Sequence, residues 1–410
     1  MNCSKKNRII HINCLDTGST GKIIVEITKG IHNEWDSLLC CPKKNVDYQY
    51  LNTIGICFNH EQGIYKRINY LYCLRFGFAP IATCKLLNVI KEFKPDVVHI
   101  HSPNVNMINV YKLLNFLKAN KITTVITNHS ELFYTGNCTH SLDCSKWESG
   151  CGNCEHNAKV NEALFFDRTS FAWGKMKNCF KDFEMCTVVS VSPWQFERSK
   201  KSPILEGIKQ VIINNGINTN VFHYENDLRL RKELNLTEEI KLVVHVTARF
   251  SLEKNDIKGG YYFKLLADRF KEDNVIFIVV GHSEENIIKD SNIIFLGNIK
   301  DQQQLARIFS QADLTVVASK KETFGMTVIE SLCCGTPVIG FKAGGPESIT
   351  MDNYSKFISY GDIDQLEITT RKFLNRSFDK QEISNEAIEI YDSDIMAKKY
   401  EALYDSKTKQ

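Results

Sequence analysis

Two acidic residues, Glu322 and Glu330, are separated by seven residues in a segment where a loop leads into a helix. The apolar run before Glu322 predicts a strand, and the pattern after Gly325 predicts a helix that leaves Glu330 polar in its second turn. Free backbone amides at a helix N-terminus bind anions, whereas carboxylates further back suit hydroxyl groups. The segment therefore predicts a ligand with phosphate and hydroxyl groups. Two solvated surface carboxylates remain the alternative.

Two cations follow another predicted strand, at residues 241–246. Arg249 ends that strand, and Lys258 lies in a Lys-Gly-Gly segment that opens the next helix. Fixed positive charge at the end of a strand suits a diphosphate, because the cations stabilise the diphosphate leaving group as it departs. Lys254 competes with Lys258 for this role, and a solvated basic loop is the other interpretation.

A glycine loop, Asp-Thr-Gly-Ser-Thr-Gly-Lys at residues 16–22, follows the first predicted strand. Gly18 and Gly21 would let the backbone approach a ligand closely where the loop opens a helix. The loop lacks the first glycine and the final Ser or Thr of a phosphate-binding Walker loop, and it is not a GxGxxG dinucleotide fingerprint. A plain strand-to-helix turn would keep the same glycines.

The chain has fifteen cysteines, an odd number that cannot all pair and that fits a reducing compartment. Four of them cluster after residue 137, namely Cys138, Cys144, Cys151 and Cys154. Four thiols with one CxxC pair have the number and softness for a tetrahedral structural zinc site. Two disulfides or simply packed thiols remain open, because spacing does not show geometry.

Strands and helices alternate twice along the 410 residues, which predicts an α/β protein with two doubly wound parallel sheets. We expect an N-terminal domain over 1–200, a second domain over 201–383, and a C-terminal helix over 384–410 that packs back on the first domain. An Asn/Gly-rich turn at 214–218 is the expected hinge. Ligands of such sheets bind beyond the carboxyl ends of the strands.

Composition excludes several classes of protein. With 43% hydrophobic and 24% charged residues, the chain is an ordinary globular protein. A net charge of +3 is too small for a nucleic-acid binder that relies on bulk charge. No segment has the run of about 18 apolar residues that a membrane-spanning helix needs, and a signal-peptide core is absent. These features predict a cytoplasmic protein.

The pair Glu322 and Glu330, followed by Gly335-Thr336-Pro337, resembles the Glu-x7-Glu motif of retaining family 4 glycosyltransferases. This family has the glycosyltransferase-B (GT-B) fold, in which two Rossmann-like domains face each other across a cleft. The glycine loop, the Asn-Gly-Ile hinge and the Lys-Gly segment occur in the family's order. The Cys-rich loop is similar to that of a subgroup of these enzymes.

The resemblance implies roles for individual residues. Glu322 and His129 would be the catalytic contacts to the transferred sugar. For His99 and His101 we expect only hydrogen-bonded interior or surface groups, as is usual for a single histidine. Within the donor site, Glu330 would bind the ribose hydroxyls, and Arg249 and Lys258 the diphosphate. The implied donor-binding residues are Gly18, Gly21, Arg249, Lys258, Phe324, Gly325, Met326 and Glu330.

The resemblance also implies a reaction. A sugar would move with retention, and without a catalytic metal, from a nucleoside-diphosphate donor to a carbohydrate or lipid-linked acceptor. The expected setting is the synthesis of surface polysaccharide, capsule or lipopolysaccharide. A nucleotide-sugar epimerase of the same fold and a non-catalytic sugar or metal sensor are the alternatives.

A basic, aromatic segment at residues 63–91 contains no acidic residue. Its cations and aromatic rings would suit docking of the first domain on anionic lipid at the cytoplasmic face of the membrane. An amphipathic packing helix with solvated charges is an equally good interpretation. The members of the segment include Tyr65, Lys66, Arg67, Tyr70, Arg75, Phe76, Phe78, Lys85 and Lys91.

Overall fold

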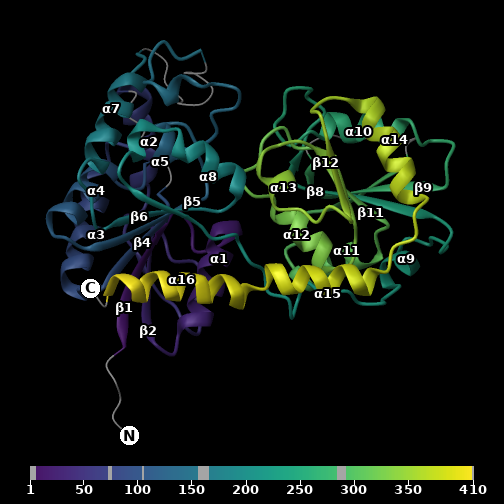
Figure 1. Cartoon of the computed structure of the whole chain (residues 1–410), viewed down its shortest axis with the longest axis horizontal. Coiled ribbons are helices and arrows are strands. Elements are labelled where there is room, and N and C mark those ends of the chain that lie inside the picture. The colour runs from purple at the N-terminus through teal and green to yellow at the C-terminus, as the bar shows by residue number, and fades with distance from the viewer. Residues whose placement is uncertain (1–5, 73–75, 104–105, 156–165, 284–291, 409–410) are drawn as a thin grey trace, which may run out of the picture. The chain divides into compact units, whose positions relative to one another are not determined.

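The computed structural model describes residues 6–72, 76–103, 106–155, 166–283 and 292–408 (Figure 1). The chain divides into two compact units. The first comprises Met1–Asn214 together with Asp394–Gln410, and the second comprises Asn215–Ser393. Each unit is an α/β domain with its own parallel sheet and its own hydrophobic core.

The first unit contains a seven-stranded parallel sheet in the order β3-β2-β1-β4-β5-β6-β7. The central strands are almost completely buried because helices cover both faces. The strands are β1 (Asn7–Asn13), β2 (Trp35–Cys41), β3 (Asn52–Gly55), β4 (Val97–Ser102), β5 (Thr123–Asn128), β6 (Cys186–Ser190) and β7 (Lys209–Ile212).

The helices of the first unit bury one apolar stripe each against this sheet. In α1, for example, Ile23, Ile27 and Ile31 repeat at helical spacing and are buried. The helices are α1 (Gly18–Ile31), α2 (Glu61–Tyr72), α3 (Pro80–Phe93), α4 (Val110–Ala119), α5 (Leu132–Thr135), η1 (Lys146–Glu148), α7 (Thr169–Phe180), α8 (Pro193–Lys200), η2 (Pro203–Leu205) and the C-terminal α16 (Ser393–Thr408).

The second unit contains a six-stranded parallel sheet in the order β10-β9-β8-β11-β12-β13. Its strands are β8 (Lys241–Phe250), β9 (Val275–Ser283), β10 (Ile293–Gly297), β11 (Leu314–Val317), β12 (Val338–Phe341) and β13 (Ser355–Ile358). Its helices are α9 (Arg229–Glu233), α10 (Gly260–Asp268), α11 (Gln302–Gln311), α12 (Met326–Cys333), α13 (Gly345–Ser348), α14 (Ile363–Leu374) and α15 (Lys380–Tyr391).

Both sheets reverse their strand order at one point, between β1 and β4 in the first unit and between β8 and β11 in the second. At such a switch point the connections leave in opposite directions, which opens a crevice beyond the carboxyl ends of the two strands. The topology therefore directs attention to the loops that follow these four strands, and it confirms the prediction of two doubly wound domains.

Two predicted boundaries need correction. The first domain does not end near residue 200, because β7 still pairs with β6 and the division falls after Asn214, in the Asn/Gly-rich turn. The predicted helix at 384–410 is two helices. Of these, α15 packs on α12 of the second unit, whereas α16 belongs to the first unit from Asp394 onward.

The basic, aromatic segment is only partly a surface feature. Tyr65 and Phe76 are buried in the first unit, so these two rings pack in the core instead of facing a partner. Arg75 lies outside the described residues. Within the described part of the chain, none of the helices combines the length and the apolar character needed to cross a membrane.

Candidate functional site

The second unit brings a predicted cation and a predicted acid together at its switch point. Lys258 follows β8 and Glu322 follows β11, and Nζ of Lys258 lies 2.6 Å from Oε1 of Glu322. The two side chains are 36% and 23% exposed, so the pair is accessible from solvent while its geometry is held by the fold. A positive and a negative group are thus available side by side where the fold is expected to bind a ligand.

The loop that carries Lys258 is held against the end of β11. Gly259 has a φ of +73°, and a Cβ atom there would lie 1.9 Å from the carbonyl oxygen of Ala318. The amide of Lys320 donates to the carbonyl of Ile257 over 2.8 Å, which joins the two loops directly. A glycine is therefore required after Lys258, because any side chain would push the lysine away from Glu322.

A second glycine turn fixes the backbone of Glu322. The Glu322 amide donates to Ala343 over 3.0 Å, and the Gly345 amide donates back to the Glu322 carbonyl over 2.9 Å. A Cβ atom on Gly345 would lie 2.4 Å from backbone atoms of Thr323, so the two segments touch without intervening side chains. This turn was not predicted, although a Gly-Gly-Pro run shortly after a buried strand was the available signal.

Helix α12 begins at Met326, four residues after Glu322. Gly325 is its N-cap with a φ of +98°, and the structure gives this cap no side-chain hydrogen bond in the described residues. Phe324 is buried and anchors the turn, while Met326 and Glu330 are partly exposed on one side of the helix. The first turn thus offers backbone amides to an anion, with the Glu330 carboxylate one turn further on.

The other predicted cations lie nearby in the sequence but are more exposed. Arg249 is exposed near the end of β8, where it stands opposite His282 of β9. Lys254 is exposed in the following loop, and Lys258 is the lysine that contacts Glu322 in the structure. The structure therefore favours Lys258 over Lys254 as the lysine of this site.

In the first unit, the glycine loop follows β1 as predicted. Gly18 has a φ of +75° and begins α1. A Cβ atom on Gly21 would lie 2.8 Å from the backbone of Asp16, so the loop closes tightly on itself. The Asp16 carboxylate accepts hydrogen bonds from Asn45, including one of 2.8 Å from its side-chain amide, which ties the loop to the segment after β2.

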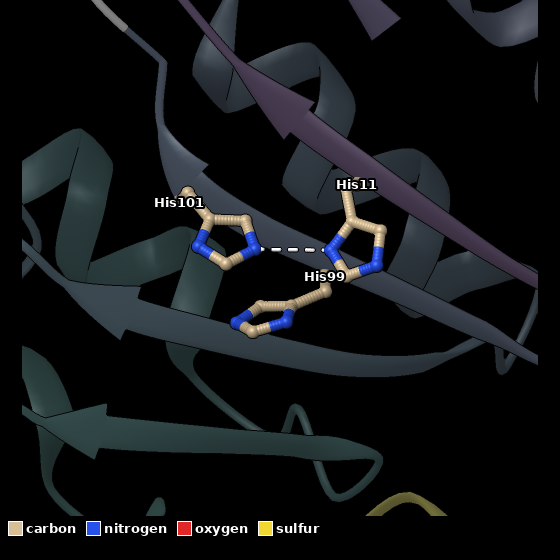
Figure 2. Close-up of side chains that lie close together, drawn as sticks. All are labelled: His11, His99 and His101. Carbon is tan, nitrogen blue, oxygen red and sulfur yellow. Dashed lines mark hydrogen bonds between the residues drawn. The ribbon is translucent and has the colours of Figure 1, made fainter. Parts of the chain in front are cut away.

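His129, which follows β5, is partly exposed and lies at the end of a row of histidines. Its Nε2 is 3.1 Å from Nδ1 of His101. Nε2 of His101 is in turn 3.1 Å from Nδ1 of His11 (Figure 2). His99 and His101 are buried and hydrogen-bonded, as predicted. Burial lowers the pKa of His129 to about 4 and that of His11 to about 3, so both rings are neutral at pH 7. His11 was missed because a single polar residue in an apolar strand gave no pattern.

The predicted zinc ligands Cys138, Cys144, Cys151 and Cys154 are all half-buried. Burial and the three neighbouring thiols raise the pKa of Cys138 to about 12. In the described residues, a group of three ligand atoms within 4.8 Å of one another occurs at His11, His99 and His101 and not among the four cysteines. The residue types fit zinc, but the sulfur atoms of the four cysteines are not close enough together to coordinate one ion in this structure. Zinc binding therefore stays a prediction.

Solved structures with the same fold cover almost the whole chain. A glycosyltransferase from Rickettsia africae matches with a TM-score of 0.69 at 16% identity, over 99% of both chains. Anabaena HepE in complex with UDP and glucose matches with a TM-score of 0.65 at 15% identity, over 97% of this chain and 99% of that one. Together with the two parallel sheets, these matches define a two-domain, Rossmann-like protein of the GT-B fold.

Family models identify both halves of the chain. Residues 22–221 match "Glycosyltransferase Family 4", and residues 227–389 match "Glycosyl transferases group 1". These two matches, together with the neighbours of the GT-B fold, support a family 4-like glycosyltransferase.

Curated relatives are distant. N-acetyl-alpha-D-glucosaminyl L-malate synthase of Bacillus anthracis is 24% identical over 37% of this chain, and the match spans only 40% of that enzyme's length. An uncharacterized 41.2 kDa protein in the cps region of Klebsiella pneumoniae is 21% identical over 94% of this chain and 99% of its own length. The putative colanic acid biosynthesis glycosyl transferase WcaC of Escherichia coli is 22% identical over 66% of each chain.

Proposed function

We propose that this protein transfers a sugar from a nucleoside-diphosphate donor to a carbohydrate or lipid-linked acceptor. The observation that carries the proposal is the contact between Lys258 and Glu322 beside the first turn of α12. A diphosphate needs a cation and backbone amides, and a sugar needs a carboxylate to hold its hydroxyl groups. These groups meet at the switch point of the second sheet.

Each group has a separate task in this proposal. Lys258, with Arg249, neutralises the diphosphate as negative charge develops on the leaving group. Glu330 accepts hydrogen bonds from the ribose hydroxyls. Glu322 and the amides near Phe324 and Gly325 hold the transferred sugar.

We propose that transfer proceeds with retention and without a catalytic metal. The bond between the anomeric carbon and the diphosphate oxygen breaks, and the acceptor oxygen bonds to the same face of that carbon. The departing phosphate takes the acceptor proton, so the step needs no separate protein base. Lys258 and the α12 amides stabilise the charge on this phosphate until the proton arrives.

The biological setting that we propose is the assembly of a surface polysaccharide. The support comes from the relatives named for colanic acid biosynthesis and for a cps region. The nucleotide donor is supported by neighbours that contain UDP, UDP-glucose or ADP.

We propose in addition that the surface of α2 and α3 docks on anionic membranes. Lys66 and Arg67 are exposed on α2, next to apolar side chains that solvent reaches. Exposed basic and apolar groups together favour an anionic lipid surface. Sedimentation with liposomes that does not depend on their anionic lipid content contradicts this docking. The exposed apolar residues are Ile64, Tyr70, Leu71, Phe78 and Ile81.

A turnover assay tests the reaction itself. Each nucleotide sugar is incubated with the protein, with and without carbohydrate acceptors, and both nucleotide release and the sugar product are measured. A transferase releases nucleotide faster when the correct acceptor is present. Isomerisation of the sugar without an acceptor indicates an epimerase, and binding without any turnover indicates a sensor. Unchanged activity after both Glu330→Ala and Lys258→Ala overturns the assignment of the site.

A further inference from the structure

Three histidines of the first unit form a continuous row of ring-to-ring contacts, which we call the histidine chain. His11 on β1, His101 on β4 and His129 after β5 are joined by two nitrogen-to-nitrogen distances of 3.1 Å. Figure 2 shows the rings of His11 and His101 facing each other across the first of these contacts. The three strands are neighbours in the sheet, so the fold itself sets the spacing of the rings.

One end of the histidine chain, at His11, is buried in the protein, and the other end, at His129, lies just beyond the carboxyl end of β5. His11 and His101 are 0% and 1% exposed, whereas His129 is partly exposed. Burial lowers the pKa of all three rings, because a charged imidazolium loses its hydration there. At pH 7 each ring therefore carries one proton, and each has one donor nitrogen and one acceptor nitrogen.

Neutral rings in a row must all point their protons the same way. Each contact needs one proton, and His101 has both nitrogens in contacts, so its two neighbours cannot both donate to it. In one arrangement His11 donates to His101 and His101 donates to His129. In the other arrangement His129 donates to His101, and the last proton is on Nε2 of His11.

The surroundings of His11, at the buried end of the histidine chain, distinguish the two arrangements. Nε2 of His11 is buried and has no hydrogen-bond partner within the described residues. A buried N–H group without an acceptor is rare in folded proteins because its full desolvation cost is unrecovered. The arrangement with a proton on this atom is therefore disfavoured, and the proton of His11 belongs on Nδ1.

We propose that His11 and His101 are positioning residues that hold His129 in the tautomer protonated at Nδ1. Nε2 of His129 then accepts a hydrogen bond from His101, and its only N–H group is on the opposite side of the ring. His129 is thereby fixed as a donor toward an acceptor oxygen on that side. If the proposed function holds, the recognised oxygen belongs to a hydroxyl group of a sugar substrate, and this part of the inference rests on that function.

His99 lies beside the histidine chain and is hydrogen-bonded through both of its ring nitrogens. Its Nδ1 lies 2.7 Å from the hydroxyl of Tyr404, and its Nε2 lies 2.8 Å from that of Thr127. Both nitrogens are thus engaged, and Thr127 is held in turn by Tyr400 of α16. The centroid of the His99 ring also lies 3.8 Å from that of His101, with an angle of 34° between the two ring planes.

Nitrogen NMR of the ligand-free protein tests the inference independently of any enzymatic activity. Ring-labelled histidine reports protonated and unprotonated nitrogens separately, and the signals of His129 are those missing from the His129→Gln spectrum. The result expected at pH 7 is a protonated Nδ1 and an unprotonated Nε2. A protonated Nε2, or a doubly protonated ring, overturns the proposal whether or not the chain transfers sugar.

Variants of His101 separate positioning from simple packing. His101→Asn keeps an amide N–H near the position of Nδ1, so His129 should retain its tautomer, whereas His101→Leu should abolish the fixed Nδ1–H signature. His99→Gln is the matched control, with His129 expected to be unchanged. If the leucine variant does not fold, the wild-type spectrum still decides. Equal signals in the leucine and asparagine variants, or selective shifts of His11, His99 and His101 on adding one equivalent of Zn²⁺, contradict the proposal.

Discussion

Replacing Lys258 with methionine removes the ammonium group while keeping most of the side chain's volume. In the structure this group lies 2.6 Å from Glu322, with the two side chains 36% and 23% exposed. An ion pair that solvent reaches contributes at most about 1 kcal/mol to folding. We therefore expect Lys258→Met to lower the melting temperature by no more than about 4 °C.

The expected effect on catalysis is much larger. A hydrogen bond to a charged group contributes about 1.5 to 3 kcal/mol, and the diphosphate gains charge in the transition state. Since about 1.4 kcal/mol corresponds to a factor of ten, kcat/KM should fall by about 10- to 100-fold. Most of this loss should appear in kcat, because the charge is greatest in the transition state.

The assay is steady-state nucleotide release with the donor and acceptor found in the turnover screen. Lys254→Met is the matched control, because this lysine is exposed in the same loop and should leave kcat/KM unchanged. The reasoning is refuted if the two variants lose activity equally. It is also refuted if Lys258→Met retains full activity or melts more than about 10 °C below the wild type.

Four further outcomes follow from the structure. The Glu131 side chain is completely buried and accepts hydrogen bonds from a tyrosine hydroxyl and an arginine guanidinium. Glu131→Gln should therefore lower the free energy of unfolding, measured by urea titration, by about 3 kcal/mol. A loss below about 1 kcal/mol contradicts this expectation. Gly259→Ala should cost about 2 kcal/mol or more because its Cβ would meet Ala318. Gly63→Ala, in helix α2 with open space around it, should be neutral or stabilise the fold by up to about 1 kcal/mol; equal effects of the two variants contradict the packing argument. The histidine chain binds protons near pH 6.5 only when the protein is unfolded, so the melting temperature should fall as the pH is lowered from about 6.5 toward 4. His11→Gln should make this pH dependence of the melting temperature less steep, and an unchanged slope in the variant contradicts the expectation. Metal analysis of anaerobically purified protein should find about one zinc per chain if the four loop cysteines bind it, and a value near zero removes that prediction.

Much of the fold was predictable because both domains repeat a strong local pattern. A buried strand such as β12 is a continuous apolar run, and amphipathic helices such as α1 separate the strands. The exact boundary was not predictable, since β7 has a short, half-exposed sequence that only its pairing with β6 identifies as a strand. The division of the C-terminal segment into α15 and α16 likewise depends on which unit each helix packs against.

The candidate site was partly predictable. Glu322 and Lys258 could be selected by residue type and by their places after strands, but their contact depends on positive φ at Gly259 and close packing at Gly345. Such backbone contacts join loops that are distant in sequence. The histidine chain was beyond prediction for a related reason, because β1 and β4 are neighbours only through the sheet order.

The most direct test of the central claim is thermal melting of the protein with UDP-, GDP-, ADP- and TDP-sugars, for the wild type and for Glu330→Ala. A ligand present at about 100 times its Kd stabilises the folded state by about 2.7 kcal/mol. For a domain of this size, that corresponds to a rise of about 5 to 10 °C. Our account predicts such a rise for one nucleotide in the wild type and its loss in Glu330→Ala. An absence of any rise above millimolar concentrations, or an equal rise in the variant, would contradict it.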